Sequence, residues 1–590
     1  MKTKTKNKNG YISSMKCLLK SVREYKKPSI LAPIFIALEV IVECIIPYVM
    51  TLLLGKINTV PTDALMGEVL KFGGLLIFLA LLSLCCGALA GRFCAVASSG
   101  FAKNLRKDLF YKIQGFSFSN IDKFSSSSLV TRLTTDVSNV EMSYMMLIRT
   151  AIRSPFMLIF SMTMAFTLNS RIALIFLATT PVLATGLILI MMKAVPFFNK
   201  IFKKYDKLNE SVEENIKGMR VVKSYVREDY EKKKFENASN EVRKDFTKAE
   251  KIIALNGPLM NFCAYSGLIA IYVFGSMLII KSKGELMKWT ELQSFMTYSF
   301  QMLMSLMMLS MIMVTLIMSS VCAKRIAEVL NEENTIVSPE NAKTSVEDGS
   351  IEFKNVSFKY FSNAERFALD NVNLKIESGE TVGILGSTGS SKSTLVNLIP
   401  RLYDVSEGEV LVSGVNVKDY DLNTLRDAVA MVLQKNVLFS GTLKENMQWG
   451  DENASDEEII TALKLAQIEN FKLDKRIEQG GVNVSGGQKQ RLCIARALLK
   501  KPKILILDDS TSAVDTKTDA LIRKSFKEYI PETTKIIIAQ RVASVQDADK
   551  ILIMDNGTLT AVGNHDTLLE NNAIYQELYY SQNKAGDNNG

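Results

Sequence analysis

A run of ten residues in the second half of the chain has the types and spacing of a phosphate-binding loop. It follows a short β-branched apolar run and precedes the pattern of a helix start. Strand, Gly-rich turn, Lys with Ser or Thr, and helix is the context such a loop requires, because backbone N–H groups and the helix N-terminus surround the phosphate oxygens. We expect Lys392 to reach the outer phosphates and the Ser393 hydroxyl to bind Mg²⁺. The loop consists of Leu385, Gly386, Ser387, Thr388, Gly389, Ser390, Ser391, Lys392, Ser393 and Thr394.

One residue of this loop departs from the usual spacing. Ser391 stands where the last glycine of the pattern belongs. Glycine at that position avoids a Cβ close to the nucleotide. The substitution therefore concerns how tightly the loop binds phosphate, and it leaves the identity of the loop intact.

Two further segments carry polar groups that suit the same chemistry. The apolar run 503–507 predicts a buried strand, and it ends in Asp508 and Asp509. A carboxylate at a strand tip can hold Mg²⁺ through water. Between the loop and this strand, Ser485, Gly486, Gly487 and Gln488 open a second predicted helix.

The strands and helices that must position these residues lie in the second half of the chain, and the first half has the composition of a membrane domain. A chain of 590 residues is too long for one domain, and 47% of it is hydrophobic, with the apolar residues concentrated before about residue 325 in runs long enough to span a bilayer. Six spans are predicted at 28–54, 69–95, 142–167, 172–195, 253–280 and 292–318. The Lys- and Arg-rich segments after the second and fourth spans place these segments, the N-terminus and the soluble half in the cytoplasm. The net charge of +10 therefore indicates membrane anchoring, and no nucleic-acid partner is expected.

Two features inside the spans have open interpretations. Glu39 and Glu43 lie four residues apart on one helix face, where they can line a substrate or ion path or pair with Arg92, Arg149 or Arg153. Eight methionines occur between Met296 and Met318 in the sixth span, and they suit either a promiscuous apolar cavity or ordinary helix packing. The cysteines Cys44, Cys85, Cys86 and Cys263 are expected to pack as small apolar residues.

The order of these motifs resembles that of ATP-binding-cassette (ABC) exporters of the half-transporter type, over nearly the whole chain. The resemblance implies a multi-domain protein, with an all-α six-helix transmembrane domain fused to an α/β P-loop NTPase domain. We expect an N-terminal tail and interfacial helix at 1–27, the transmembrane domain at 28–325, a linker at 326–350 and the ATP-binding cassette at 351–590. ATP and Mg²⁺ are the implied cofactors, and the plasma membrane is the implied location.

The resemblance also implies roles for individual residues. Tyr360 looks like the aromatic residue that stacks on adenine, Gln434 like the loop glutamine that touches Mg²⁺, and Asp508 like the Mg²⁺-associated aspartate. Ser485–Gln488 is similar to the signature that acts on the partner's ATP. Segments 116–124 and 213–224 resemble the coupling helices that dock onto cassettes. The loop that crosses to the partner cassette is similar to the segment from Ser512 to Asp515.

Two departures from the family pattern concern catalysis. Asp509 stands where the family has its catalytic glutamate, and Gln540 where it has a switch histidine; the single histidine, His565, lies downstream and reads as a loop residue. The Asp509 carboxylate is set back by about 1.5 Å, the length of one C–C bond. Loss of a general base typically costs on the order of 10²–10⁴-fold in rate. These departures resemble the non-catalytic half of a heterodimeric exporter.

Three functions stay open at this stage. The first is the degenerate subunit of a heterodimeric exporter, whose partner half-transporter carries the consensus catalytic site and whose cargo is a hydrophobic or amphipathic small molecule. The second is a homodimer that hydrolyses ATP slowly, with Gln540 orienting water. The third is an ATP-gated sensor or scaffold without transport. The transported compound itself cannot be derived from cavity side chains without knowing the helix rotations.

Overall fold

The computed structural model describes residues 15–57, 61–361, 364–469, 472–510 and 514–587. The chain forms two compact units. The helical unit comprises Met1–Gly115 and Ser125–Glu332, and the sheet unit comprises Phe116–Phe124 and Glu333–Gly590. A nine-residue segment of the N-terminal half thus belongs to the same unit as the C-terminal half.

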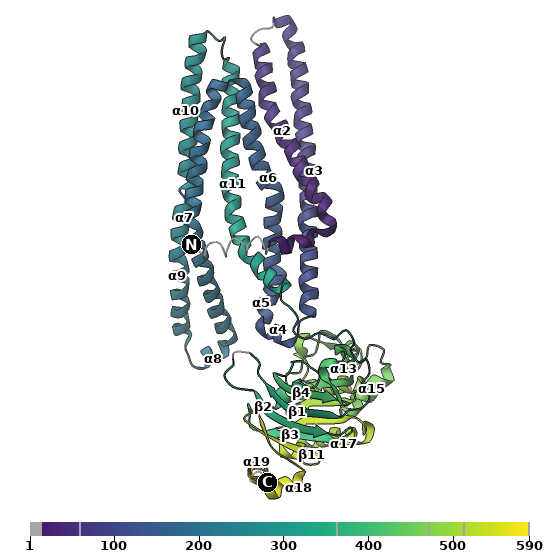
Figure 1. Cartoon of the computed structure of the whole chain (residues 1–590). Helices are drawn as coiled ribbons and strands as arrows, with labels where there is room; N and C mark the ends of the chain where they lie inside the picture. Colours follow the sequence, from purple (N-terminus) through teal and green to yellow (C-terminus); the bar gives the residue numbers. More distant parts are fainter. Residues whose placement is uncertain (1–14, 58–60, 362–363, 470–471, 511–513, 588–590) are drawn as a thin grey trace. The chain divides into compact units, whose positions relative to one another are not determined.

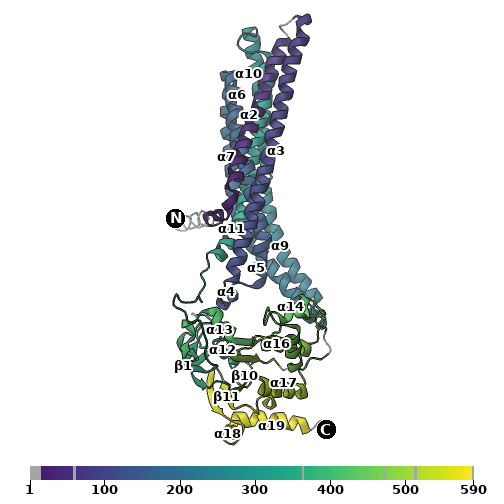
Figure 2. The same cartoon turned by 90° about the vertical axis from the view of Figure 1, so that its right-hand side faces the viewer.

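The helical unit is built from long helices that run side by side (Figures 1 and 2). A short 3₁₀ turn, η1, precedes them, and a single π-helical stretch, η2, interrupts the segment before α6. α3 alone has 53 residues, which is about 80 Å and far more than the roughly 30 Å core of a bilayer. The bounds are η1 Lys20–Tyr25, α2 Lys26–Ile57, α3 Thr62–Gln114, α5 Ser126–Thr131, η2 Arg132–Asp136, α6 Val137–Leu168, α7 Ser170–Lys217, α8 Met219–Ser224, α9 Glu228–Ile253, α10 Asn256–Ser282 and α11 Trp289–Leu330.

Six helical segments in the described part of the chain are long and apolar enough to cross a membrane, so the predicted number of spans is confirmed. The polar segments between spans, expected as loops, are largely helical, because α3, α7 and α9 continue as amphipathic helices beyond the apolar windows. Hydropathy finds the apolar windows and carries no information on where a helix ends. The end of α11 at Leu330 likewise lies inside the segment expected as a linker.

The acidic pair in the first span has a basic partner. Arg153 on α6 donates from Nη1 to Glu39 Oε1 at 2.6 Å and from Nη2 to Glu43 at 2.8 Å. The Glu39 carboxylate also lies against Gly87, where an added Cβ would be 3.1 Å from Oε1. This pairing supports the structural interpretation of the two glutamates over a substrate role. Of the cysteines expected to pack as small apolar residues, Cys44, Cys86 and Cys263 are buried and Cys85 is exposed.

The described residues of the sheet unit form three sheets. The first has the antiparallel strand order β2-β1-β4-β5, and the second has the order β12-β11-β3-β10-β9-β6, in which all neighbours are parallel except β11 and β12. The third is the short pair β7-β8. The strand bounds are β1 Ile351–Phe358, β2 Leu369–Ile376, β3 Thr381–Gly386, β4 Glu407–Val412, β5 Val415–Asn416, β6 Val429–Val432, β7 Gly441–Thr442, β8 Arg476–Ile477, β9 Ile504–Asp508, β10 Thr534–Ile538, β11 Lys550–Asp555 and β12 Thr558–Gly563.

The parallel sheet borders two apolar cores: helices form the first with it, and the antiparallel sheet together with further helices forms the second. The strands β9 and β10 are buried along their whole length, as expected for a parallel sheet covered on both faces. The all-α part and the α/β part together confirm the predicted fold class. The helix bounds are α4 Phe118–Lys123, α12 Lys392–Asn397, η3 Val417–Asp419, α13 Leu422–Ala428, α14 Leu443–Met447, α15 Asp456–Leu465, η4 Gln479–Gly481, α16 Gly486–Leu499, α17 Thr516–Tyr529, η5 Val542–Ser544, α18 His565–Asn571 and α19 Ala573–Asp587.

The parallel order has a direct consequence for the polar residues singled out in the sequence. β3 runs into the phosphate loop, β9 ends at Asp508, β10 ends two residues before Gln540, and β6 ends two residues before Gln434. Carboxyl ends of parallel strands lie at one edge of a sheet, which is where ligands bind in such folds. The topology therefore brings segments from four distant parts of the chain to one place.

The ionic cluster of the helical unit generates a stability prediction. Arg153→Met would leave Glu39 and Glu43 charged and without their guanidinium partner. We expect a loss of roughly 2 kcal/mol, below the full value for breaking a buried pair because the cluster is partly exposed. Thermal unfolding of the purified protein in detergent should show a lowered midpoint.

Two controls make this prediction specific. Arg149→Met removes an exposed guanidinium one turn away on the same helix and should change the midpoint little. Combining Arg153→Met with Glu39→Gln and Glu43→Gln removes every charge of the cluster and should recover most of the loss. Equal effects of the two arginine substitutions, or no recovery in the triple variant, would contradict the pairing.

Candidate nucleotide site

The phosphate loop joins β3 to α12, and its backbone requires unusual conformations. Gly386 has φ +152°, and a Cβ there would lie within van der Waals radii of the Met554 carbonyl oxygen. Ser391 has φ +69°, which is the left-handed region that costs a non-glycine residue roughly 1–2 kcal/mol. The expected departure at Ser391 thus has a physical meaning, since the missing glycine is at a position whose backbone favours glycine.

The Lys392 side chain is directed along the loop. Its ammonium donates to the carbonyl oxygens of Gly386 at 2.9 Å and Ser387 at 2.7 Å, and to Ser390 Oγ at 3.3 Å. Burial lowers the pKa of Lys392, while the carboxylates of Asp508 and Asp509 oppose this shift. An ammonium group beside the backbone N–H groups of such a loop can bind the outer phosphates of a nucleotide.

A hydroxyl and a carboxylate suited to Mg²⁺ lie beside this lysine. Ser393 Oγ donates to Asp508 Oδ1 at 3.0 Å, and Asp508 is buried. Burial raises the pKa of Asp508, with a further contribution from the neighbouring Asp509, while Ser393 and Lys392 lower it. Hard oxygen donors of this kind fit Mg²⁺, which is bound by one or two protein groups together with phosphates and water. Ser393 and Asp508 would therefore hold the ion, which supplies charge neutralisation for the phosphates.

Asp509 is engaged by two amides. Gln540 Nε2 donates to Asp509 Oδ2 at 2.8 Å, and Gln434 Nε2 donates to the same oxygen at 3.4 Å. The backbone of Asp509 has φ +48°, a conformation that Asp adopts more readily than most residues with longer side chains. The two sequence departures, Asp509 and Gln540, are thus hydrogen-bonded to each other.

Tyr360 lies two residues beyond β1 and reaches the helix that follows the phosphate loop. Its hydroxyl is 2.9 Å from Thr394 Oγ1, and its ring meets Phe358 and Tyr403 edge to face, with centroids 4.9 and 5.3 Å away. The side chain is 40% exposed. It therefore has a free surface on which a purine base can stack.

The predicted signature is separate from this cluster in the described part of the chain. Ser485 caps α16: its Oγ accepts from the Gln488 N–H at 3.3 Å, and the Gln488 side chain accepts from the Ser485 N–H at 3.2 Å. Ser485 and Gly486 are exposed. Asp515 caps α17 by accepting from the Thr518 N–H at 2.9 Å, while Ser512 lies outside the described residues. Both motifs thus form exposed helix starts.

The sequence did not single out Tyr403 or its partners on α4. The Tyr403 hydroxyl donates to Asp122 Oδ2 at 2.7 Å, and its ring meets Phe118 edge to face at 6.0 Å. Burial and the Asp122 carboxylate raise the pKa of Tyr403. Segment 116–124, expected as a coupling helix, is therefore bound to the sheet unit beside Tyr360. In the sequence Tyr403 stands in a loop next to Asp404, and nothing in that pattern indicates a contact with α4.

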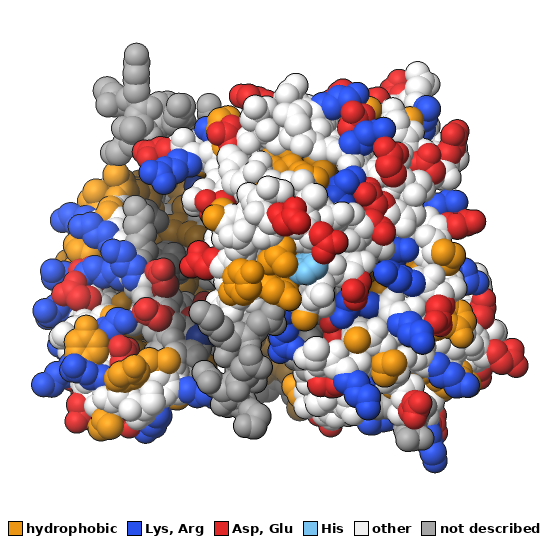
Figure 3. Space-filling view, turned by 90° about the horizontal axis from the view of Figure 1, so that it is seen from below, with side chains coloured by type: hydrophobic (Ala, Val, Ile, Leu, Met, Phe, Trp, Pro, Cys, Tyr) orange, Lys and Arg blue, Asp and Glu red, His pale blue; other side chains and the backbone are white. Residues whose placement is uncertain are grey.

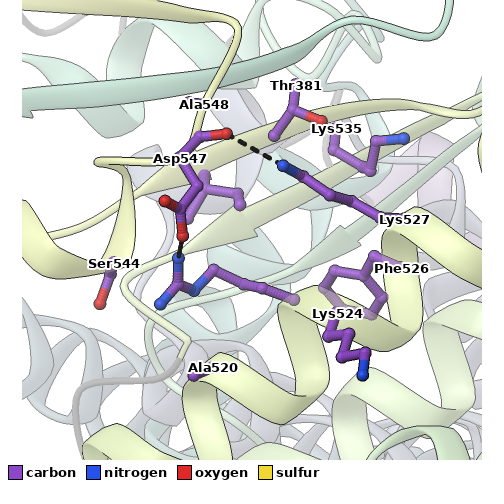
Figure 4. Close-up of a pocket in the computed structure, with 11 residues that line it drawn as sticks. Thr381, Ala520, Lys524, Phe526, Lys527, Lys535, Ser544, Asp547 and Ala548 are labelled. Carbon is purple, nitrogen blue, oxygen red and sulfur yellow. Dashed lines mark hydrogen bonds and ion pairs between the residues drawn. The ribbon is translucent and has the colours of Figure 1, made fainter. Parts of the chain in front are cut away.

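A cavity of about 170 Å³ beneath α17 is a poor candidate for a second ligand site (Figure 4). Arg523 Nη1 is 3.0 Å from Asp547 Oδ2 and Nε is 3.4 Å from Asp519 Oδ2. Lys535 Nζ donates to the carbonyl oxygens of Ile530 and Pro531 just beyond the end of α17. The Arg523 guanidinium is therefore used in ion pairs, and the Lys535 ammonium is used by carbonyl oxygens beyond the end of α17.

Comparisons with known proteins show which family each of the two units is similar to. The family model described as the ABC transporter transmembrane region matches residues 29–306, and the model described as ABC transporter matches residues 369–512. The chain is 35% identical to the uncharacterized ABC transporter ATP-binding protein YfiB of Bacillus subtilis over 580 residues, covering 95% of this chain and 98% of that protein. It is 34% identical to Rv1273c of Mycobacterium tuberculosis, a protein with the same description, covering 82% and 84% of the two chains.

A solved structure is similar in fold over most of this chain. The structure of a bacterial Atm1-family ABC exporter with ATP bound superimposes with a TM-score of 0.81, covering 95% of this chain and 98% of that one. Sequence identity is 21%, so the likeness concerns the fold.

The strained backbone at Ser391 generates a binding prediction. Ser391→Gly should tighten ATP binding by up to roughly five-fold, because this conformation costs serine about 1 kcal/mol and the serine loop gains by leaving it whenever no nucleotide is bound. Equilibrium titration with a fluorescent ATP analogue measures the change. Ser391→Ala keeps the Cβ and removes only the hydroxyl, so it should show no such gain. An equal gain from alanine would assign the effect to the hydroxyl and contradict the role of strain.

Proposed function

Because the chain belongs to the ABC transporters, with an exporter-type membrane part fused to one ATP-binding cassette, we propose that it is the hydrolytically impaired subunit of a heterodimeric exporter. Its own site binds ATP and Mg²⁺ through many transport cycles. Its signature completes the catalytic site of a partner half-transporter. The pair moves hydrophobic or amphipathic small molecules outward across the plasma membrane, with the sheet unit and the N-terminus in the cytoplasm.

The observation that carries this proposal is the hydrogen bond of 2.8 Å between the Gln540 amide and the Asp509 carboxylate. A general base must present a lone pair to the attacking water within hydrogen-bond reach. Asp509 is one methylene shorter than glutamate, and its Oδ2 accepts from two amides. Gln540 is uncharged at every physiological pH and cannot supply an imidazolium. Both changes act against hydrolysis at the same point.

The groups proposed to bind the nucleotide, in contrast, are all present, although Ser391 replaces the last glycine of the phosphate loop. Lys392 lies along the phosphate loop, Ser393 and Asp508 present oxygen donors to Mg²⁺, and Tyr360 offers an exposed ring to adenine. Charge neutralisation and positioning of the phosphates need no general base. A site with these groups is expected to hold ATP while turning it over slowly.

The exposed start of α16 favours action on a partner. Ser485 and Gly486 are exposed, and the capping box shapes the first turn of a 14-residue helix. Backbone N–H groups at such a helix start stabilise phosphate charge. In the family's head-to-tail dimer this turn faces the γ-phosphate on the other cassette, so an intact signature here serves the partner's site.

Apolar side chains on both units favour a second subunit. α8 and the turn after it expose Met219, Val221 and Tyr225, the last at 74%. The sheet unit has a groove of about 380 Å³ with Phe439 and Trp449 stacked at 4.2 Å along it. We assign this groove to the coupling helix of the partner half-transporter, and α8 to the corresponding groove of the partner's cassette.

The sixth span favours an apolar cargo. Met304, Met308 and Met311 recur at a spacing that places them on one face of α11, and all three are exposed. Thioether side chains adapt to ligands of different shape. A face of this kind suits a cavity that accepts varied hydrophobic or amphipathic molecules.

Two substitutions separate the proposed roles. Ser485→Arg would fill the space that the partner's γ-phosphate needs, so it should lower the ATPase activity of the complex at least ten-fold. Asp509→Ala alters only the impaired site and should lower activity less than two-fold. Steady-state ATPase of the purified complex measures both.

The outcomes distinguish the alternatives. If Asp509→Ala damages activity as much as Ser485→Arg, the chain is catalytic at its own site, as a slowly hydrolysing homodimer would be. If the wild-type complex binds ATP and changes conformation yet moves no amphipathic dye in proteoliposomes, the chain is an ATP-gated sensor. Either result would overturn the proposed role.

A further inference from the structure

The last helix of the chain holds the loop that carries Gln540. Gln582 on α19 uses both ends of its side-chain amide: Nε2 donates to the Gln540 carbonyl oxygen at 3.0 Å, and Oε1 accepts from the Val542 N–H at 2.8 Å. The amide therefore bridges the backbone on both sides of Arg541. A pair of such bonds fixes the position and the direction of the loop at once.

The clamped loop leads directly into the nucleotide site. Gln540 donates its own side-chain amide to Asp509 Oδ2, and Asp509 follows Asp508, which pairs with Ser393. A shift of the loop by about 1 Å would move the Gln540 amide beyond the 2.7–3.2 Å range of a hydrogen bond. The position of α19 thus bears on the shorter of the two amide bonds to Asp509 Oδ2, the 2.8 Å bond from Gln540.

α19 is itself anchored in the apolar core by Tyr575, which contacts the single histidine of the chain on α18. His565 Nδ1 lies 2.6 Å from the Tyr575 hydroxyl, and the ring packs against Tyr575 and Tyr579. Tyr575 is fully buried, and burial raises its pKa to about 12. In Figure 3, His565 lies at the surface beside a group of hydrophobic side chains, and Figure 2 shows α18 and α19 together at one end of the sheet unit. The anchor leaves Gln582 in a defined place.

We propose that Gln582 is a positioning residue for the nucleotide site: by clamping the loop on both sides of Arg541, it keeps the Gln540 amide on Asp509 and so holds the site in its non-hydrolysing form. This rests on the proposed function for the role of Gln540. Gln582 bonds to the backbone of the loop, so these two hydrogen bonds do not depend on the side chain at position 540.

The first test measures the clamp itself. Gln582→Ala removes the acceptor of the Val542 N–H, so hydrogen–deuterium exchange in peptides that contain Val542 should become roughly two- to ten-fold faster. Gln576→Ala is the matched control, because Gln576 on the same helix donates to the Leu569 and Glu570 carbonyl oxygens and not to the loop. It should leave exchange at Val542 unchanged. Equal exchange in both variants would overturn the clamp regardless of any catalytic role.

The second test measures the consequence. Photo-cross-linkable ATP labelled on the γ-phosphate is bound to the full-length complex, and loss of label from this chain reports hydrolysis at its own site. Gln582→Ala should raise this rate a few-fold, because Asp509 Oδ2 then loses the 2.8 Å bond from Gln540, which is shorter than the 3.4 Å bond from Gln434, whereas simple destabilisation would lower it. In a Gln540→Ala background the same substitution should have no further effect.

The results separate the two proposals. An unchanged or lowered own-site rate in Gln582→Ala, or an undiminished effect in the Gln540→Ala background, would overturn the positioning role. Rapid own-site hydrolysis in the wild type would instead refute the proposed function, and the exchange result at Val542 would still stand.

Discussion

The carboxyl edge of the parallel sheet is the constraint on which the nucleotide site depends. Because β3, β9, β10 and β6 are parallel neighbours, the phosphate loop, the aspartate pair and two glutamines meet although more than 150 residues separate the first from the last. At this edge the Gln540 amide donates to the Asp509 carboxylate, which we propose as the impaired general base. The strand order that assembles the site thus also brings the Gln540 amide onto the Asp509 carboxylate.

Side-chain contacts connect the nucleotide site to α4, a segment from the membrane half of the sequence. Tyr403 touches Tyr360 on one side and α4 on the other, through Phe118 and Asp122. A base that stacks on Tyr360 therefore lies one side chain away from the segment that connects α3 to α5. These two ring contacts of Tyr403 have the edge-to-face geometry that aromatic pairs prefer.

The sequence predicted local structural elements well and long-range contacts poorly. The phosphate loop, the strand before Asp508 and the six spans carry strong periodic or motif signals, and the structure has these elements where they were expected. The site roles of Ser393 and Asp508 stay predictions, although the two side chains are hydrogen-bonded. The Tyr403–Asp122 and Gln582–Gln540 contacts had no signal, because tertiary packing brings together residues 281 and 42 positions apart. The helical ends of α3 and α7 were missed because polar residues at helical spacing do not register as spans.

Restoring the consensus residues is the most direct test of the impaired site. Hydrolysis of cross-linkable ATP held by this chain is compared in the wild type and in the variant that combines Asp509→Glu with Gln540→His. We expect the wild type to retain the γ-phosphate through many turnovers of the complex. The double variant should release it at least about 10²-fold faster, the typical contribution of a general base. Equal rates, with the wild type already hydrolysing at the turnover rate of the complex, would contradict an impaired site.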